Sequence, residues 1–145
     1  MRIKELFESK NVEIIIFGEN HFKFNEVTKI RNAVVDFNPD AILHELYWEE
    51  LSFFSQKLPN TPVLPLEKEV GKHFKDIKSQ FKSREKSMIA HMEKAKRKFK
   101  RIAIVVGDTH LRTIQTPELG DVSPLLKWAM ANNAKVIRSN YKEIL

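Results

Sequence analysis

The chain has 145 residues, of which 42% are hydrophobic, with four glycines, six prolines and no cysteine. This composition is typical of one globular domain spanning residues 1–145, and it excludes disulfides, thiolate metal sites and a cysteine nucleophile. The net charge of +6 is uneven, because residues 68–101 carry 13 Lys and Arg against four Asp and Glu. No run approaches the roughly 18 apolar residues of a membrane span, and residues 1–10 lack the apolar core of a signal peptide, so we expect a cytoplasmic protein.

Strands and helices are predicted to alternate in the first half of the chain. Residues 12–17 form an apolar, β-branched run that predicts a buried strand. Asn25 is predicted to cap a helix that ends before Pro39, because the residue before a proline disfavours the helical conformation. A second strand over residues 41–46 precedes a helix over 47–58, and residues 61–66, which contain two prolines, predict a short edge strand at best.

The second half continues this alternation. Residues 68–99 predict one long helix or two, with an apolar seam interrupted by Arg84 and His91. Residues 102–106 form another buried strand, Ser123-Pro124 is a favourable helix start, and residues 135–139 predict the last strand. The expected fold is therefore α/β, with a mostly parallel sheet of about four to five strands and helices on both faces.

Two similar motifs follow two of the predicted strands, Gly18-Glu19-Asn20-His21 and Gly107-Asp108-Thr109-His110. Glycine at such a position allows a positive φ or the close approach of another group. Ligands of parallel α/β sheets bind at the carboxyl edge, which both motifs would occupy. Since another predicted strand ends near Glu45, we expect three side chains to converge at this edge: His21, Glu45 and His110. Glu19 and Asp108 are expected beside them.

Two imidazoles and one carboxylate are a suitable ligand set for a divalent ion such as Zn, Mn or Co. Such an ion would activate water, and Arg84 would bind a substrate anion or stabilise an oxyanion. Without a metal, His21 would act as a general base that Glu19 or Glu45 activates. The residues alone leave both possibilities open.

The elements Gly18-x-x-His21, Glu45, Arg84-Glu85 with Met88, and Gly107-x-x-His110 occur in the order found in a group of related families. This order resembles the TraB/PrgY-like families, the Tiki metalloproteases, ChaN-like proteins and erythromycin esterases. The resemblance implies a fold of the erythromycin esterase/ChaN-like kind and an active site lined by His21, Glu45 and His110, with Arg84 facing them. It implies a hydrolase, either a metal-dependent peptidase or a metal-free esterase, and ChaN-like proteins add haem as a less favoured cofactor.

Two other functions compete with a hydrolase acting on a small molecule or peptide. The basic segment 68–101 could bind nucleic acid without catalysis, or it could be only a solvated helix surface. The chain could also be a degenerate member of the same group, kept as a metal- or haem-binding scaffold.

Overall fold

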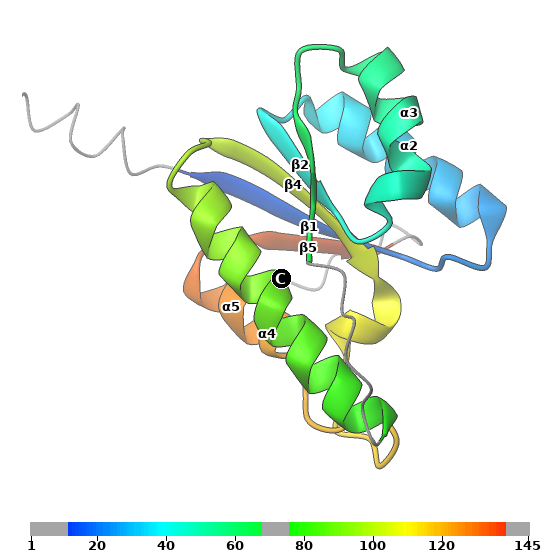
Figure 1. The fold of residues 1–145 in the computed structure, drawn as a ribbon, viewed down its shortest axis with the longest axis vertical. Coiled ribbons are helices and arrows are strands. Elements are labelled where there is room, and N and C mark those ends of the chain that lie inside the picture. Colours follow the sequence, from blue (N-terminus) through cyan, green and yellow to red (C-terminus); the bar gives the residue numbers. More distant parts are fainter. Residues whose placement is uncertain (1–11, 68–75, 139–145) are drawn as a thin grey trace, which may run out of the picture.

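In the computed structural model, which describes residues 12–67 and 76–138, the chain forms a five-stranded, wholly parallel sheet (Figure 1). The α/β fold predicted from the sequence is confirmed. The strand order is β3-β2-β4-β1-β5. The strands span β1 Glu13–Glu19, β2 Ala41–His44, β3 Val63–Pro65, β4 Arg101–Gly107 and β5 Lys135–Arg138.

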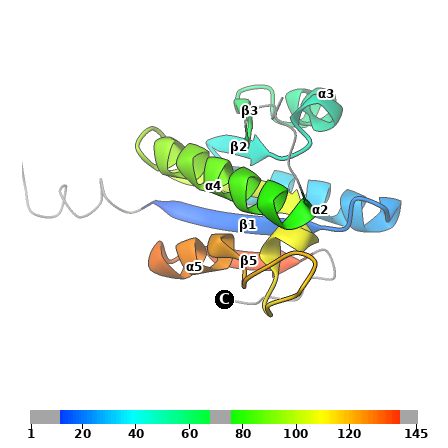
Figure 2. The ribbon, with the colours of Figure 1, turned by 60° about the horizontal axis from the view of Figure 1, so that its bottom comes forward.

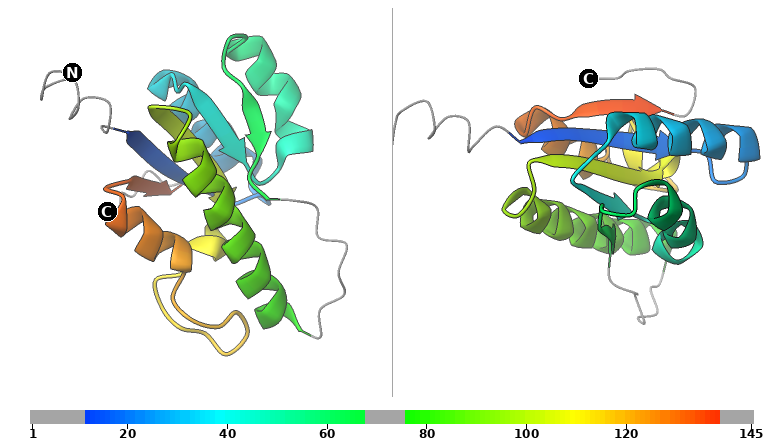
Figure 3. Two further views of the ribbon diagram at one scale, coloured as in Figure 1. Left: turned by 60° about the vertical axis from the view of Figure 1, so that its left-hand side comes forward. Right: turned by 90° about the horizontal axis from the view of Figure 1, so that it is seen from above.

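Helices cover both faces of this sheet, as Figures 2 and 3 show. The helices α2 (Phe24–Phe37) and α3 (Tyr47–Lys57) bury Ile30, Val34 and Phe54 against one face. The helices α4 (Ile77–Lys96) and α5 (Pro124–Ala131) bury apolar residues against the other face, among them Met88, Met92 and Leu125. None of the helices within the described ranges is long and apolar enough to cross a membrane.

The ends of the helices agree with the sequence predictions in part. Asn25 does not cap α2, since the N-cap residue is Lys23 and no side chain caps that end. The helix ends at Asn38, which adopts a left-handed conformation (φ 52°) directly before Pro39. Ser123 caps α5 as predicted, by accepting a hydrogen bond from the backbone N–H of Leu125, with Pro124 in the first turn.

The buried face of α4 differs from the predicted seam. The seam predicted Phe81, Arg84 and His91 in the core, but these side chains are half-buried. The residues that α4 buries are Glu85, Met88, Met92 and Ala95. Met88 and Ala95 therefore agree with the predicted seam, whereas Glu85 and Met92 are buried in place of Arg84 and His91. The burial of Glu85 is tolerable because it has a buried guanidinium partner. Residues 68–75 of the predicted helical stretch lie outside the described residues.

Two helices bury residues that helical spacing alone does not predict. The spacing of Leu125, Leu126, Ala129 and Met130 predicts one apolar face for α5, but Met130 is 68% exposed and Trp128 is buried. Spacing on α3 likewise predicts that Leu51, Phe54 and Leu58 pack inward; Phe54 is buried, Leu51 and the C-cap residue Leu58 are half-buried against the core, and Glu50 is buried as well.

The central strands β1 and β4 run side by side with seven residues of each in register, Glu19 opposite Gly107 at the carboxyl end. From β1 the chain leaves through α2 on one face, and from β4 it leaves through α5 on the opposite face. Parallel sheets bind ligands at this kind of switch point, outside the carboxyl ends of the strands. A ligand site is therefore expected among the segments that follow β1, β2 and β4.

Candidate active site

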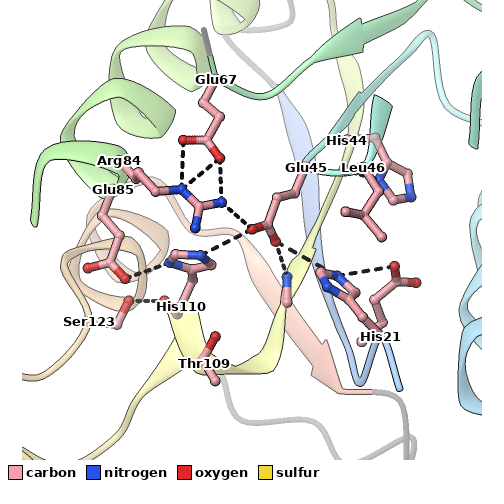
Figure 4. A network of polar contacts seen from close by, with 12 residues as sticks. His21, His44, Glu45, Leu46, Glu67, Arg84, Glu85, Thr109, His110 and Ser123 are labelled. Carbon is pink, nitrogen blue, oxygen red and sulfur yellow. Dashed lines mark hydrogen bonds and ion pairs between the residues drawn. The ribbon is translucent and has the colours of Figure 1, made fainter. Parts of the chain in front are cut away.

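The carboxylate of Glu45, in the residue after β2, lies at the centre of a polar network at this edge of the sheet (Figure 4). Its Oε1 accepts a hydrogen bond from the backbone N–H of Gly107 (2.7 Å). Its Oε2 accepts one from Nη2 of Arg84 (2.7 Å) and lies 3.2 Å from Nε2 of His110. Burial alone would raise the pKa of Glu45, but the bonds from His110 and Gly107 outweigh it and lower the pKa to about 2. Glu45 is therefore ionised at neutral pH.

His110 is held between two carboxylates in a short 3-10 helix, η1 (Asp108–Leu111), that follows β4. Its Nδ1 lies 2.8 Å from Oε2 of Glu85, and its ring stacks on Phe81. Glu85 in turn receives two hydrogen bonds from the buried guanidinium of Arg112. Burial would lower the pKa of His110, but the bonds to Glu45 and Glu85 raise it above the ordinary range. This ring is only 2% exposed, so it positions Glu45 rather than facing solvent.

His21 follows β1 and is the more accessible of the two predicted histidines, with 24% of its side chain exposed. Its Nε2 atom is buried without a hydrogen-bond partner, 3.4 Å from Oε1 of Glu19 and 3.8 Å from Oε1 of Glu45. The inner nitrogen of His21 thus lies between two carboxylates, and the exposed part of the side chain faces the open edge of the sheet. The predicted convergence of His21 and His110 on Glu45 is present, with Glu45 bridging them.

Arg84 reaches this centre from α4 and makes the predicted contact with Glu45. The structure adds a second partner that the sequence analysis missed, Glu67, which receives hydrogen bonds from Nε (3.0 Å) and Nη2 (2.6 Å) of Arg84. Burial would lower the pKa of Arg84, but Glu67 and Glu45 raise it further, so the group is permanently charged. Its third nitrogen, Nη1, has no dashed contact to any residue drawn in Figure 4. Glu67 lies two residues after the end of β3 and could have been identified as another acidic residue near a strand end.

Glu19 is the least satisfied polar side chain of the site. It is fully buried at the end of β1, and neither of its carboxylate oxygens has a hydrogen-bond partner. It lies on the α2/α3 face, where burial and the nearby Glu50 raise its pKa to about 8. Glu19 is therefore mainly protonated at neutral pH, whereas Glu45 is ionised.

The two glycines of the motifs allow neighbouring side chains to pack closely against the backbone, and neither glycine has a positive φ. Gly18 and Gly107 both lie within strands, and neither has the left-handed conformation. A Cβ on Gly107 would lie 3.0 Å from Cε1 of His21 and 3.2 Å from Oε1 of Glu45. A Cβ on Gly18 would lie 2.6 Å from both Oδ1 of Asp108 and Cδ1 of Leu111. Gly107 thus makes room for the candidate site, and Gly18 makes room for η1.

Asp108, expected beside the site, is packed over Gly18. Its ion-pair partner among the described residues is Arg138, with Oδ1 at 3.9 Å from Nη1. Burial raises the pKa of Asp108, although Arg138 opposes this effect. Asp108 thus lies over Gly18 at the start of η1 and is within electrostatic range of His21, as expected for a residue beside the site.

The closest grouping of possible metal ligands in the described part of the chain differs from the predicted set of His21, Glu45 and His110. Among the described residues, the one group of three such side chains whose ligand atoms all lie within 4.8 Å of one another is Glu19, His44 and Glu50. In that group Nδ1 of His44 already accepts the N–H of Leu46, and both oxygens of Glu50 bind Arg31. Burial lowers the pKa of His44 to about 3, so this ring is neutral, with its proton on the other nitrogen.

Glu45 itself has little capacity left for a metal ion, because its two oxygens receive Gly107 N–H and Arg84 and face both histidines. A cation bound between His21, Glu45 and His110 would have to displace some of these contacts. The residues therefore fit such an ion poorly in the arrangement described. The predicted metal stays a prediction.

Comparison of the chain with protein-family models, with curated proteins and with solved structures finds no match. The resemblance to TraB-like proteins and erythromycin esterases remains a prediction based on the motif residues, and the site is interpreted below from its own geometry.

Proposed function

We propose that the chain is a hydrolase of esters or related acyl compounds, with His21 as general base and the ionised Glu45, 3.8 Å from its inner nitrogen, as the anion that stabilises its protonated form. The observation that carries this proposal is the difference in pKa between the two carboxylates, Glu19 and Glu45, that lie on either side of Nε2 of His21. The pKa of Glu19 is raised to about 8, and that of Glu45 is lowered to about 2. Neighbouring groups whose surroundings separate their pKa values in this way are typical of acid–base catalysis.

In the proposed reaction, the proton of His21 lies on Nε2, towards Glu45, and the other ring nitrogen, Nδ1, accepts a proton from water. The water oxygen attacks the carbonyl carbon of the substrate, and the ionised Glu45 stabilises the resulting imidazolium. The tetrahedral intermediate then expels the alcohol, which takes the proton back from His21.

Arg84 is the proposed electrophile of this site. Two of its nitrogens are held by Glu67 and Glu45, so the guanidinium is fixed in place before a substrate arrives. The free Nη1 atom is then a preorganised donor for the developing oxyanion, and such donors contribute most when they need no reorganisation.

A metal-dependent version has one specific observation in its favour. Glu85 contacts Nδ1 of His110, and histidine ligands of metals commonly donate their second N–H to a carboxylate. A bound divalent ion would supply Lewis-acid activation of water. His21, Glu45 and His110 would be the residues that hold this ion. Assays with and without added ions separate the two versions.

The test is hydrolysis of a panel of p-nitrophenyl esters, a peptide amide and a p-nitrophenyl phosphate, each with EDTA or with added Mn, Co or Zn. We expect ester turnover in EDTA, and we expect His21→Gln to lower kcat/KM by about 10²–10⁴-fold. The matched control is His91→Gln, because His91 lies on α4 outside the site and contacts the carbonyl of Ser87.

Equal activity of wild type and His21→Gln would refute the assignment of His21. Turnover that occurs only with added metal would favour the metal-dependent version. The absence of turnover of every substrate under all conditions would argue against a hydrolase.

A further inference from the structure

A cavity of about 510 Å³ lies beside the candidate active site, between α4 and the loop that leads from η1 to α5. Cavities of this size are typical of small-molecule sites. Its wall on the α4 side includes Lys78, Lys82 and Lys86, which follow one another at intervals of four residues and so lie on one face of the helix. Lys127 of α5 adds a fourth ammonium group.

The charges of this cavity are not balanced. Arg112 and Glu85 also line it, but they neutralise each other in a two-bond ion pair, which leaves Asp121 as the remaining acidic side chain of the wall. None of the four lysines has an ion-pair partner among the described residues. Like charges four residues apart on a helix repel each other, so the row of lysines favours a bound anion.

Other parts of the cavity wall are apolar, and the loop on one side is held by backbone hydrogen bonds. Ile89, Leu119 and Val122 line it beside the lysines. The loop wall is fixed by two hydrogen bonds between the backbones of Thr116 and Gly120. Gly120 has a φ of +93°, and a Cβ there would lie 3.2 Å from the side chain of Lys78. An extended nucleic-acid backbone would not fill such a hollow, because its phosphates are contacted along a surface.

We infer that this cavity binds a small amphipathic anion, with a phosphate, sulfonate or carboxylate at Lys78, Lys82, Lys86 and Lys127 and an apolar body against Ile89 and Val122. This inference concerns a second site and does not depend on the proposed hydrolase activity. The two sites share Glu85, which faces the cavity and also contacts His110.

The test uses two fluorescent probes with the same aromatic body. One is 1-anilinonaphthalene-8-sulfonate, and the other is N-phenyl-1-naphthylamine, which lacks the sulfonate. We expect one site for the sulfonate and at least tenfold weaker binding of the neutral probe. The double variant Lys82→Gln/Lys86→Gln should weaken sulfonate binding at least tenfold and leave the neutral probe unchanged.

The matched control is Lys94→Gln/Lys98→Gln, which removes the same charge outside this cavity and should bind the sulfonate like wild type. Cooperative thermal unfolding of each variant shows that the fold is kept. Amide resonances of Gly120 and Val122 should shift with the probe. Shifts confined to Asn132 and Asn133, which line a separate cavity near the amino end of β1, would overturn the assignment.

Competition separates the possible sources of the anion. Octyl phosphate should displace the sulfonate probe at least tenfold more effectively than inorganic phosphate. Equal competition by inorganic phosphate would overturn the amphipathic recognition. Displacement by a short DNA duplex at lower concentration than octyl phosphate, with a steep salt dependence, would overturn the small-molecule assignment in favour of nucleic acid.

Discussion

At the scale of single residues, Arg84 illustrates how a charge is held ready for use. A guanidinium that is largely removed from water needs carboxylate partners, and it has two, Glu45 and Glu67. These partners use Nε and Nη2 and leave Nη1 for a ligand. Replacement by an apolar residue would leave two carboxylates without compensation, so a conservative change is the more informative probe.

Arg84→Lys keeps the positive charge but removes the planar fork and Nη1. We expect kcat/KM for the best ester to fall about 10²–10³-fold, as for the loss of one oxyanion donor. The free energy of unfolding should fall by about 2 kcal/mol, because hydrogen bonds to charged groups are lost. Steady-state kinetics and urea unfolding measure both quantities. Arg101→Lys serves as the control, since Arg101 pairs with Glu13 at the opposite edge of the sheet; an equal loss of activity there would contradict the role of Arg84.

At the scale of elements, the two Gly-x-x-His segments bring the site together through strand pairing. The register that sets Glu19 opposite Gly107 fixes where η1 begins and where the chain turns towards His21. The backbone N–H of Gly107 then donates a hydrogen bond to Glu45, the residue after the neighbouring strand β2. The strand ends therefore contribute contacts to the site and also position its side chains.

Gly107→Ala tests this arrangement. Its Cβ would push against the ring of His21 and the carboxylate of Glu45, and displacements of about 1 Å at a reacting group cost roughly 10²-fold in rate. We expect this loss in kcat/KM with a destabilisation of about 1–3 kcal/mol from overpacking. Gly18→Ala, whose Cβ would meet Asp108 and Leu111 at 2.6 Å, should destabilise at least as strongly. Full activity of Gly107→Ala would show that His21 and Glu45 need not keep these positions.

The elements also show which features the sequence could predict. The strand ends placed His21, Glu45 and His110 together, because each strand is recognised from its own residues and the carboxyl ends of parallel strands meet at one edge of the sheet. Glu67, Glu85 and Arg112 were not predicted as members of the network. Their contacts join the segment after β3, α4 and the segment after η1, and the burial of Glu85 is compensated by Arg112, 27 residues later in the chain. The helical period alone could not distinguish Glu85 from Arg84 as the inward residue.

At the scale of the whole molecule, buried ionisable side chains of the described residues gather near the carboxyl edge of the sheet, on both of its faces. Glu85 and His110 lie on the α4/α5 face, where they flank Glu45 through His110, and Glu19 and His44 lie on the α2/α3 face. Such burial opposes folding unless partners compensate it, and Glu19 has no hydrogen-bonding partner among the described residues. Stability is thus lowered where chemistry is proposed, as is common at functional sites.

This cost gives a prediction for the pH dependence of folding. The pKa of Glu19 is raised from about 4.5 when unfolded to about 8 when folded, so its neutral form favours the folded state. Its contribution is complete below pH 4.5 and is lost as pH rises towards 8, with a slope of at most about 1.4 kcal/mol per pH unit. His44, with a folded pKa of about 3, acts in the opposite direction up to its ordinary range near 6.5.

The difference between wild type and Glu19→Gln isolates Glu19, because His44 and His110 are present in both proteins. Urea unfolding at intervals from pH 5 to 8 should give similar stability near pH 5 and a variant that becomes progressively more stable than wild type towards pH 8. Parallel stability profiles would contradict a neutral Glu19. They would also remove the contrast with Glu45 from which acid–base chemistry was proposed, since Glu19 would then be ionised, like Glu45, on the other side of His21.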